Sequence, residues 1–265
     1  MAVRFSEYMD TVAEKHPLVH HITNYVTVND CANICICSGG APVMTDEVKD
    51  VVDMSRIANA IVLNMGTLNE RTVEAMLLAG KIGKENGAVV IFDAVGAGAT
   101  PYRNQIAESI IDVVKPDVIK GNDGEISFLA GIAGGVRGVD STSSSGNMAE
   151  IVKCLAHKYG CLVVSTGKID HISDGKTVYK LSNGDDMEGF VSGTGCMLSS
   201  VLGTYAGANG ASAEALVAAV SAFNIAAEHS VKKSKGPGSF KVGLFDCLFN
   251  LKPEDIDREA KIEVL

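Results

Sequence analysis

Tryptophan is absent from this 265-residue chain, and aromatic residues make up only 5% of it. Hydrophobic residues nevertheless reach 46%, against 21% charged residues, so small aliphatic side chains must fill the interior. This balance is typical of a soluble globular protein and argues against disorder. The chain is long enough for one domain over residues 1–265 that buries roughly three quarters of its unfolded surface.

Basic residues are also in deficit. The sequence has 23 Lys and Arg against 32 Asp and Glu, which gives a formal net charge of −9. Nucleic-acid binding draws most of its affinity from Lys and Arg that meet phosphates. The composition therefore disfavours a nucleic-acid partner, and a small anionic cosubstrate would need a local binding site.

Long apolar segments are missing as well. No basic N-terminal stretch leads into an apolar run, and the most apolar helix candidate, residues 214–228, is too short to span a bilayer. That candidate also contains Ser221 and Asn224. We therefore expect no membrane association and a cytoplasmic location.

The seven cysteines are an odd number in a chain without a secretion signal, which argues against a disulfide framework. Cys31, Cys35 and Cys37 lack the CxxC pair or nearby histidine that would complete a zinc site. The i, i+4 spacing of Cys31 and Cys35 instead fits the buried face of a helix. The adjacent His20 and His21 have no acidic partner beside them, so we interpret them as structural residues or as part of a subunit contact.

Short apolar runs alternate with helical periodicity along the chain. Four runs that end in glycine or a polar residue are typical of buried strands: residues 60–66, 87–98, 117–122 and 161–167. Helical patterns occupy residues 69–87 and 147–160, and each ends on a glycine. This order predicts right-handed crossovers and an α/β fold, a three-layer αβα sandwich with a mainly parallel central sheet.

The second half of the chain departs from that alternation. Polar and apolar residues alternate around Asp174-Gly175, which predicts a two-residue hairpin at the edge of the sheet. The "DGKT" in this hairpin is no Walker A site, because the motif requires glycine where Asp170 stands. Residues 196–232 predict two packed helices, and a glycine-bearing linker at 234–239 leads to a final amphipathic helix.

The segment "VSGTGCMLSS", residues 191–200, is a candidate anion site. If it opens a helix, the backbone N–H groups of Thr194, Gly195 and Cys196 lack intrahelical acceptors and point outward at the positive end of the helix dipole. Gly193 and Gly195 would let a phosphate approach the backbone closely. The alternative is a glycine-rich turn that serves packing alone.

Polar residues follow several of the predicted strands, at the edge where parallel sheets bind ligands. Asp93 and Glu125 come after two of them, and paired carboxylates suit Mg²⁺ together with phosphate oxygens. Lys120 and Thr166 would neutralise or contact a nucleotide phosphate. Their alternative readings are a turn cap for Asp93, a first-turn helix carboxylate for Glu125 and a surface position for Lys120.

Five segments together resemble one family. "ITNYVTVNDCAN" with "GAPVM", "DAVGAGAT", "KGNDGEI", "STGKIDHISDG" and "GTGC", in this order, resemble the 4-methyl-5-(2-hydroxyethyl)thiazole kinases of the ribokinase-like superfamily, over nearly the whole chain. The resemblance implies ATP- and Mg²⁺-dependent phosphorylation of the thiazole's primary alcohol in thiamine salvage. It also implies a homotrimer with sites at subunit boundaries.

The resemblance also implies roles for individual residues. Asn24 and Met44 would contact the thiazole, and Gly193 would lie near the substrate hydroxyl. Lys120 and Thr166 would contact ATP.

Asp93 and Glu125 would be the acids on the magnesium side, partly through water. The wider superfamily usually ends its loop in an aspartate that acts as base, and this chain has Cys196 there. Because phosphoryl transfer has a loose transition state, a strong base is not essential. We hypothesise that the loop amides stabilise the phosphoryl group while Cys196 orients the hydroxyl and weakly accepts its proton.

Several alternatives stay open. Cys196 would instead form a phosphocysteine or serve a redox role, and its charge state does not follow from the sequence. The rival activities are a kinase for hydroxymethylpyrimidine or a sugar, and a non-catalytic nucleotide or thiazole sensor on the same scaffold.

Overall fold

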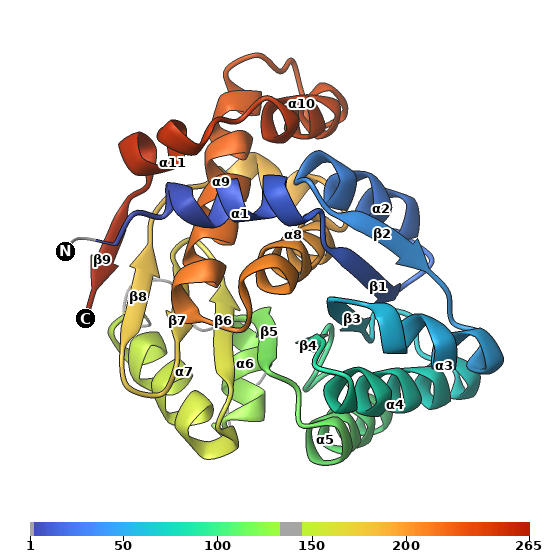
Figure 1. Ribbon diagram of the computed structural model, residues 1–265. Coiled ribbons are helices and arrows are strands. Elements are labelled where there is room, and N and C mark those ends of the chain that lie inside the picture. The colour runs from blue at the N-terminus through green and yellow to red at the C-terminus, as the bar shows by residue number, and fades with distance from the viewer. Residues whose placement is uncertain (1–2, 133–144) are drawn as a thin grey trace.

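The computed structural model describes residues 3–132 and 145–265, and within them nine strands form one sheet in the order β2-β1-β3-β4-β5-β6-β7-β8-β9 (Figure 1). The strands are β1 Leu18–Ile22, β2 Ala41–Met44, β3 Ala60–Asn64, β4 Val89–Asp93, β5 Val118–Asn122, β6 Leu162–Thr166, β7 Asp170–Ser173, β8 Val178–Leu181 and β9 Ile262–Val264. The strands from β2 to β6 pair in parallel, and β7, β8 and β9 are antiparallel additions.

Helices cover both faces of the sheet (Figure 1). They are α1 Ser6–Lys15, α2 Val28–Cys37, α3 Val48–Ile57, α4 Glu70–Glu85, α5 Pro101–Val114, α6 Asp123–Leu129, α7 Ser145–Tyr159, the 3₁₀ helix η1 Asp186–Phe190, α8 Thr194–Asn209, α9 Ala213–Val231, α10 Pro237–Phe249 and α11 Pro253–Glu259. One hydrophobic cluster joins the sheet to α1, α2, α8, α9, α10 and α11, and a second joins it to α3 through α7. The predicted three-layer αβα sandwich with a mainly parallel sheet is confirmed.

All four predicted strands are present, with ends that the turn residues set. The run at 87–98 is a strand only over Val89–Asp93. Beyond Asp93 the chain turns, with Gly96 and Gly98 at φ of 75° and 90°, values that residues with a Cβ rarely adopt. The carboxyl end of β4 is therefore fixed at Asp93, which places this carboxylate at the edge of the sheet.

The predicted hairpin is confirmed, but its place in the sheet differs from the prediction. The carboxylate oxygen Oδ1 of Asp174 accepts hydrogen bonds from the backbone N–H groups of Lys176 and Thr177 at 2.8 and 2.7 Å, which closes the turn between β7 and β8. The edge position belongs instead to β9, which pairs with β8. The single final helix was also wrong, because the chain after residue 234 forms α10, α11 and β9. Pro253 opens α11 at a position where its missing N–H costs no helical hydrogen bond.

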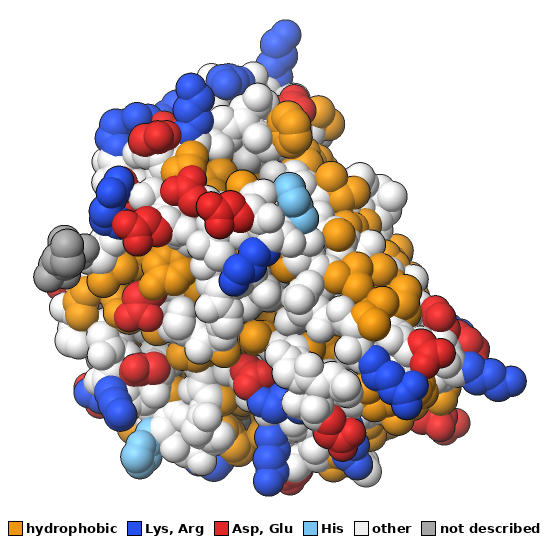
Figure 2. Space-filling model, in the orientation of Figure 1, with side chains coloured by type: hydrophobic (Ala, Val, Ile, Leu, Met, Phe, Trp, Pro, Cys, Tyr) orange, Lys and Arg blue, Asp and Glu red, His pale blue; other side chains and the backbone are white. Residues whose placement is uncertain are grey.

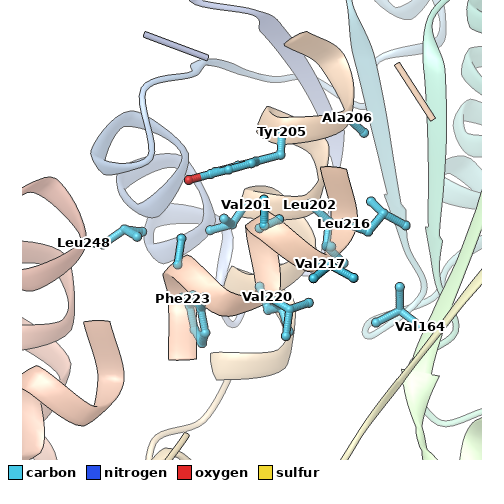
Figure 3. Packing of buried hydrophobic residues seen from close by; sticks show 14 of the residues in the cluster. Val164, Val201, Leu202, Tyr205, Ala206, Leu216, Val217, Val220, Phe223 and Leu248 are labelled. Atoms are coloured by element: carbon cyan, nitrogen blue, oxygen red, sulfur yellow. The ribbon is translucent and has the colours of Figure 1, made fainter. Parts of the chain in front are cut away.

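The two predicted packed helices are α8 and α9, and both are buried on nearly all sides. Figure 3 shows Tyr205 and Leu202 of α8 among Leu216, Val217 and Phe223 of α9. A helix that is apolar all round belongs in the middle of a domain. In the part of the chain that the structure describes, no helix combines the length and hydrophobicity needed to cross a bilayer.

Cys31, Cys35, His20 and His21 are core residues. Cys31 and Cys35 lie on the buried face of α2, and burial raises the pKa of their thiols to about 11 and about 12. His20 and His21 are both buried, and burial lowers the pKa of His21 to about 4. His20 lies within 3.0 Å of the Thr45 carbonyl oxygen and 3.2 Å of the Ser55 hydroxyl. The structural reading of these residues is confirmed by their burial.

Candidate active site

The carboxyl ends of the parallel strands gather most of the predicted site residues on one face of the sheet. Residues in register on parallel strands point to the same side, and the pairs Asn64–Asp93 and Asp93–Lys120 are in register. These three side chains lie on the face that α8 covers, because Val62, two residues before Asn64, belongs to the cluster under α8. Thr166 ends β6 at the same edge.

Helix α8 begins at Thr194, as the sequence predicts, and points its first turn at this edge. The residue before it, Gly193, has a φ of 90°, and a Cβ built there would lie 2.1 Å from Cγ2 of Thr27. The positive φ favours glycine, and a side chain here would require Thr27 or the start of α8 to move. Since Gly193 has no side chain to cap the helix, the first N–H groups of α8 are available to an anion.

Cys196 lies between two asparagine amides. The Nδ2 groups of Asn24 and Asn64 each donate to its Sγ at 3.3 Å. The orientation of Asn24 is set by Thr27, whose backbone N–H and hydroxyl both donate to Asn24 Oδ1 at 3.1 and 3.0 Å. The sulfur therefore accepts two hydrogen bonds in fixed directions, and its half-buried position leaves it open to a ligand.

The structure gives the direction of the Cys196 pKa that the sequence left open. Burial raises it, and the nearby Asp93 carboxylate raises it further, while Lys120 and the two asparagine amides lower it. The net shift is upward, so Cys196 is a neutral thiol at neutral pH in the free protein. Only the minor thiolate form could accept a proton, so the role of Cys196 as a weak base stays a prediction.

Asp93 and Lys120 form a buried ion pair directly below the α8 loop. Lys120 is 4% exposed, and its Nζ donates to Asp93 Oδ1 at 3.1 Å and to the Gly195 carbonyl oxygen at 3.0 Å. Burial alone would lower the pKa of Lys120, but the Asp93 carboxylate and other nearby anionic groups outweigh it, and the pKa is raised. The surface-lysine reading is therefore wrong. Lys120 is a fixed positive charge beneath the predicted anion site.

The turn-cap reading does not hold for Asp93, whose second carboxylate oxygen also accepts hydrogen bonds from the core. Asp93 Oδ2 accepts from Asn64 Nδ2 at 2.7 Å and from the Ser199 hydroxyl at 2.8 Å, so the side chain does not cap the following turn. Glu125, in contrast, is a first-turn carboxylate of α6. Its Oε2 accepts from the Asn122 N–H and its Oε1 from the Gly96 N–H, both at 2.7 Å.

These contacts decide how the two acids fit Mg²⁺. Asp93 is fully buried, and both of its oxygens already accept from protein donors. Glu125 is half-buried and accepts one hydrogen bond at each oxygen, which leaves lone pairs free for a water molecule. Mg²⁺ in proteins usually keeps several of its waters. The residues thus fit a hydrated ion held through water near Glu125, and they do not fit direct chelation by the pair.

A cavity of about 590 Å³ opens beside the α8 loop. Its lining includes Thr166, a predicted ATP contact, and Thr194 and Gly195, which belong to the predicted anion site. Its walls also carry acidic residues that the sequence did not single out. Burial raises the pKa of two of them, Asp170 to about 6 and Glu188 to about 7.

Met44 lies at the far end of the same edge. It ends β2, is half-buried and pairs with His21 of β1, which in turn pairs with Val62 of β3. By register its side chain points to the α8 face, like that of Asn64. Its role as a thiazole contact stays a prediction, since β1 separates it from the strand of Asn64.

Two site residues were missed as participants. Asn64 is the last residue of β3, so its position at a strand end marked it as a place to look, but an asparagine alone indicates no chemistry. Ser199 lies one helical turn after Gly195 on the side of α8 that faces the sheet, and only the position of Asp93 reveals its function as a donor. Both residues are fully or almost fully buried.

The fold and this edge define a class. The chain is similar to a ribokinase-like superfamily protein from Enterococcus faecalis, with 13% identity, a TM-score of 0.66 and coverage of 91% and 93% of the two chains. It is also similar to the pyridoxal kinase from Staphylococcus aureus solved with AMP-PCP and pyridoxal, with 16% identity, a TM-score of 0.65 and coverage of 94% and 98%. These likenesses show that the fold is ribokinase-like.

Closer relatives give the family. The model of the hydroxyethylthiazole kinase family matches residues 9–254. The hydroxyethylthiazole kinase of Methanocorpusculum labreanum is 48% identical over 259 residues, and the match covers 98% of each chain. The structure of the hydroxyethylthiazole kinase protein from Pyrococcus horikoshii is 34% identical, with a TM-score of 0.91 and 98% coverage of each chain. The chain belongs to the hydroxyethylthiazole kinase family, which confirms the resemblance and, at the level of the family, an alcohol phosphotransferase.

Proposed function

We propose that the protein transfers the terminal phosphoryl group of ATP to the primary alcohol of 4-methyl-5-(2-hydroxyethyl)thiazole, as a step of thiamine salvage. Family membership supports the reaction, and one observation in the site carries it. The free amides at the start of α8 and the sulfur of Cys196 belong to consecutive residues, with the Lys120 ammonium directly beneath. A phosphate bound at the amides and a substrate hydroxyl bound at the sulfur would therefore lie next to each other.

In this proposal ATP occupies the cavity of about 590 Å³, with its phosphates against Thr194 and Gly195 and with Thr166 as a further contact in the cavity lining. The S. aureus pyridoxal kinase, which shares the fold, was solved with the nucleotide analogue AMP-PCP. The α8 amides and dipole stabilise the charge of the phosphoryl group in flight. Lys120 adds a positive charge that cannot move away, because Asp93 holds it.

The thiazole alcohol lies on the other side of the loop, near Asn24 and Met44, with its hydroxyl between Gly193 and Cys196. Because Cys196 is mainly a neutral thiol that already accepts two amide hydrogen bonds, it serves chiefly to align the hydroxyl. Only its minor thiolate form can take the hydroxyl proton, late in the transfer, and it becomes the neutral thiol by doing so. Alignment of the attacking oxygen is the main contribution expected of it.

The proposal includes Mg²⁺ held through water by Glu125. Asp93 would contribute indirectly, by holding the Lys120 ammonium in place. When bound, the ion would neutralise charge on the nucleotide phosphates. The pKa of Glu125 is raised, because burial outweighs the opposite effects of the Gly96 amide, Lys120 and the Asn122 amide.

We also propose a homotrimer in the cytoplasm, where thiols such as the seven free ones here stay reduced. Figure 2 shows hydrophobic side chains gathered along the side of the molecule where α2 and β2 lie in Figure 1. Tyr25, Val26 and Ile36, at the start of α2 and on it, are 55–78% exposed. Exposed apolar surface of this kind beside a site favours a subunit contact. Light scattering on the purified chain should give three times the monomer mass.

The activity is tested by ADP release with ATP, Mg²⁺ and one of three acceptors: the thiazole alcohol, hydroxymethylpyrimidine or a sugar. We expect turnover with the thiazole alcohol to exceed the others clearly. Preference for the pyrimidine or the sugar would move the protein to a rival kinase activity. Tight thiazole binding without ADP release would make it a sensor.

Substitutions at Cys196 test the role of the sulfur. Cys196→Ala should slow turnover by up to about 100-fold without abolishing it, because general-base help contributes typically 10²- to 10⁴-fold and a thiol supplies part of this. Cys196→Asp should keep or raise turnover, since a carboxylate accepts the proton more readily. Steady-state kinetics measures both, and equal, complete loss in both folded variants would refute the assignment.

The covalent alternative makes a different prediction. A phosphocysteine should be trapped by acid quench during turnover, and Cys196→Ser should be inactive. We expect no phosphoenzyme and residual activity in Cys196→Ser.

A further inference from the structure

The amide of Asn64 is the meeting point of the site's hydrogen bonds. Its Oδ1 accepts from the Gly66 N–H at 2.9 Å and from Asn24 Nδ2 at 3.0 Å. Its Nδ2 donates to Asp93 Oδ2 at 2.7 Å and to Cys196 Sγ at 3.3 Å. Both donor positions and both acceptor positions of this amide thus form hydrogen bonds, and the residue is 1% exposed.

This arrangement permits one orientation of the amide. A flipped Asn64 would turn its oxygen toward the Asp93 carboxylate and its NH₂ group toward the Gly66 N–H, so acceptor would face acceptor and donor would face donor. The N–H that reaches Cys196 is therefore fixed by contacts that do not involve the sulfur. Its direction is set by β3 and by the Asp93–Lys120 pair.

We infer that Asn64 is a positioning residue for the proposed phosphoryl transfer, which holds the Cys196 sulfur by tying it to the buried Asp93–Lys120 pair through one amide group. The inference rests on the proposed function and deepens it. Asn64 touches neither reactant in the proposal and acts through Cys196.

Two donors on the sulfur have a geometric consequence. With Asn24 and Asn64 both donating to Sγ, the direction left open on the sulfur points away from both amides. A substrate hydroxyl approaching Cys196 then finds an acceptor in one place only. Loss of Asn64 would let the sulfur rotate about its Cα–Cβ bond, and the hydroxyl would lose its alignment with the phosphoryl group.

Ser199 provides a matched control. Its hydroxyl donates to the same Asp93 oxygen as Asn64, at 2.8 Å, and lies 3.2 Å from the Gly195 carbonyl oxygen. Ser199→Ala therefore removes a donor from Asp93 and leaves both donors on the sulfur. Asn64→Leu, which is close to isosteric, removes one donor from Asp93 and one donor from the Cys196 sulfur.

The first measurement needs no kinase activity. Alkylation of Cys196 by iodoacetamide is followed by peptide mass spectrometry in the absence of substrates, with the exposed Cys154 as reference in the same sample. Asn64→Leu should lower the ratio of the Cys196 to the Cys154 alkylation rate by roughly tenfold, because the reactive thiolate loses one stabilising hydrogen bond. Ser199→Ala should change the ratio less than about twofold. Equal ratios in the two variants would overturn the inference.

The second measurement is a double-mutant cycle on kcat. Asn64→Leu should lower kcat by roughly 10- to 100-fold in the native background, with little change in the KM for ATP, and by less than about threefold in the Cys196→Ala background. The same loss in both backgrounds would show a structural effect and sink the proposal. If Asn64→Leu fails to fold, as circular dichroism would show, Asn64→Ala replaces it in both measurements. Should the thiazole alcohol prove not to be the substrate, the alkylation result still decides the hydrogen bond to Cys196.

Discussion

Lys120→Met should lower the free energy of unfolding by about 3–5 kcal/mol, because removing one partner of a buried ion pair leaves the other charge buried and uncompensated. The uncompensated group is Asp93, whose side chain is 0% exposed and whose Oδ1 loses its donor at 3.1 Å. Urea denaturation followed by circular dichroism measures the loss. ADP release should also fall by at least about 100-fold, since a preorganised positive charge beneath the phosphoryl group is removed.

A second substitution separates the two effects of Lys120. In Lys120→Met/Asp93→Asn the buried charge is gone, and the new amide oxygen can still accept from Asn64 and Ser199. Stability should return to within about 1–2 kcal/mol of the native chain, while activity should stay low. Lys180→Met is the control, because its pair with Glu263 is solvent-exposed and should contribute about 1 kcal/mol or less. A Lys120→Met variant as stable as Lys180→Met would contradict the buried pair.

The sequence predicts the fold where elements carry their own signal. Apolar runs such as residues 60–64 are buried on both faces, and α4 ends before Gly87, whose φ of 83° only glycine adopts readily. β9 carries no such signal. It has three residues, two of them exposed, and it is a strand only because β8 offers it an unpaired edge. Short edge strands of this kind depend on tertiary contacts that a single sequence does not show.

In the site, too, some features could be predicted from the sequence and others could not. The rule that ligands bind at the carboxyl ends of parallel strands led to Asp93, Lys120 and Thr166 without knowledge of their contacts. The burial of Lys120 was not predictable, because its counter-charge lies 27 residues earlier in the chain. The same holds for the thiol of Cys196, whose pKa depends on Asp93 and on two asparagines from β3 and the turn after β1.

Gly193→Ala should reduce kcat/KM by about 100-fold or more, because displacing reacting groups by even 1 Å can cost that much. The new Cβ would lie 2.1 Å from Cγ2 of Thr27, so either Thr27 or the start of α8 must shift. A shift of the start of α8 would move its amides and Cys196 relative to the Lys120 ammonium, and a shift of Thr27 would disturb Asn24, which donates to Cys196. Steady-state ADP release measures the loss, and thermal unfolding shows whether the fold survives.

Two further variants separate the clash from the backbone strain, which costs about 1–3 kcal/mol for a residue forced into positive φ. Gly87→Ala carries similar strain, with a φ of 83°, but its Cβ meets nothing within 4 Å, so its kcat/KM should stay within about threefold of the native value. Gly193→Ala/Thr27→Ser removes the clashing methyl group and keeps the hydroxyl that donates to Asn24 Oδ1. Because this double variant restores the space beside residue 193, it should recover at least about tenfold of the lost activity. If it recovers nothing while Gly87→Ala is as inactive as Gly193→Ala, strain and not the position of the α8 loop governs catalysis.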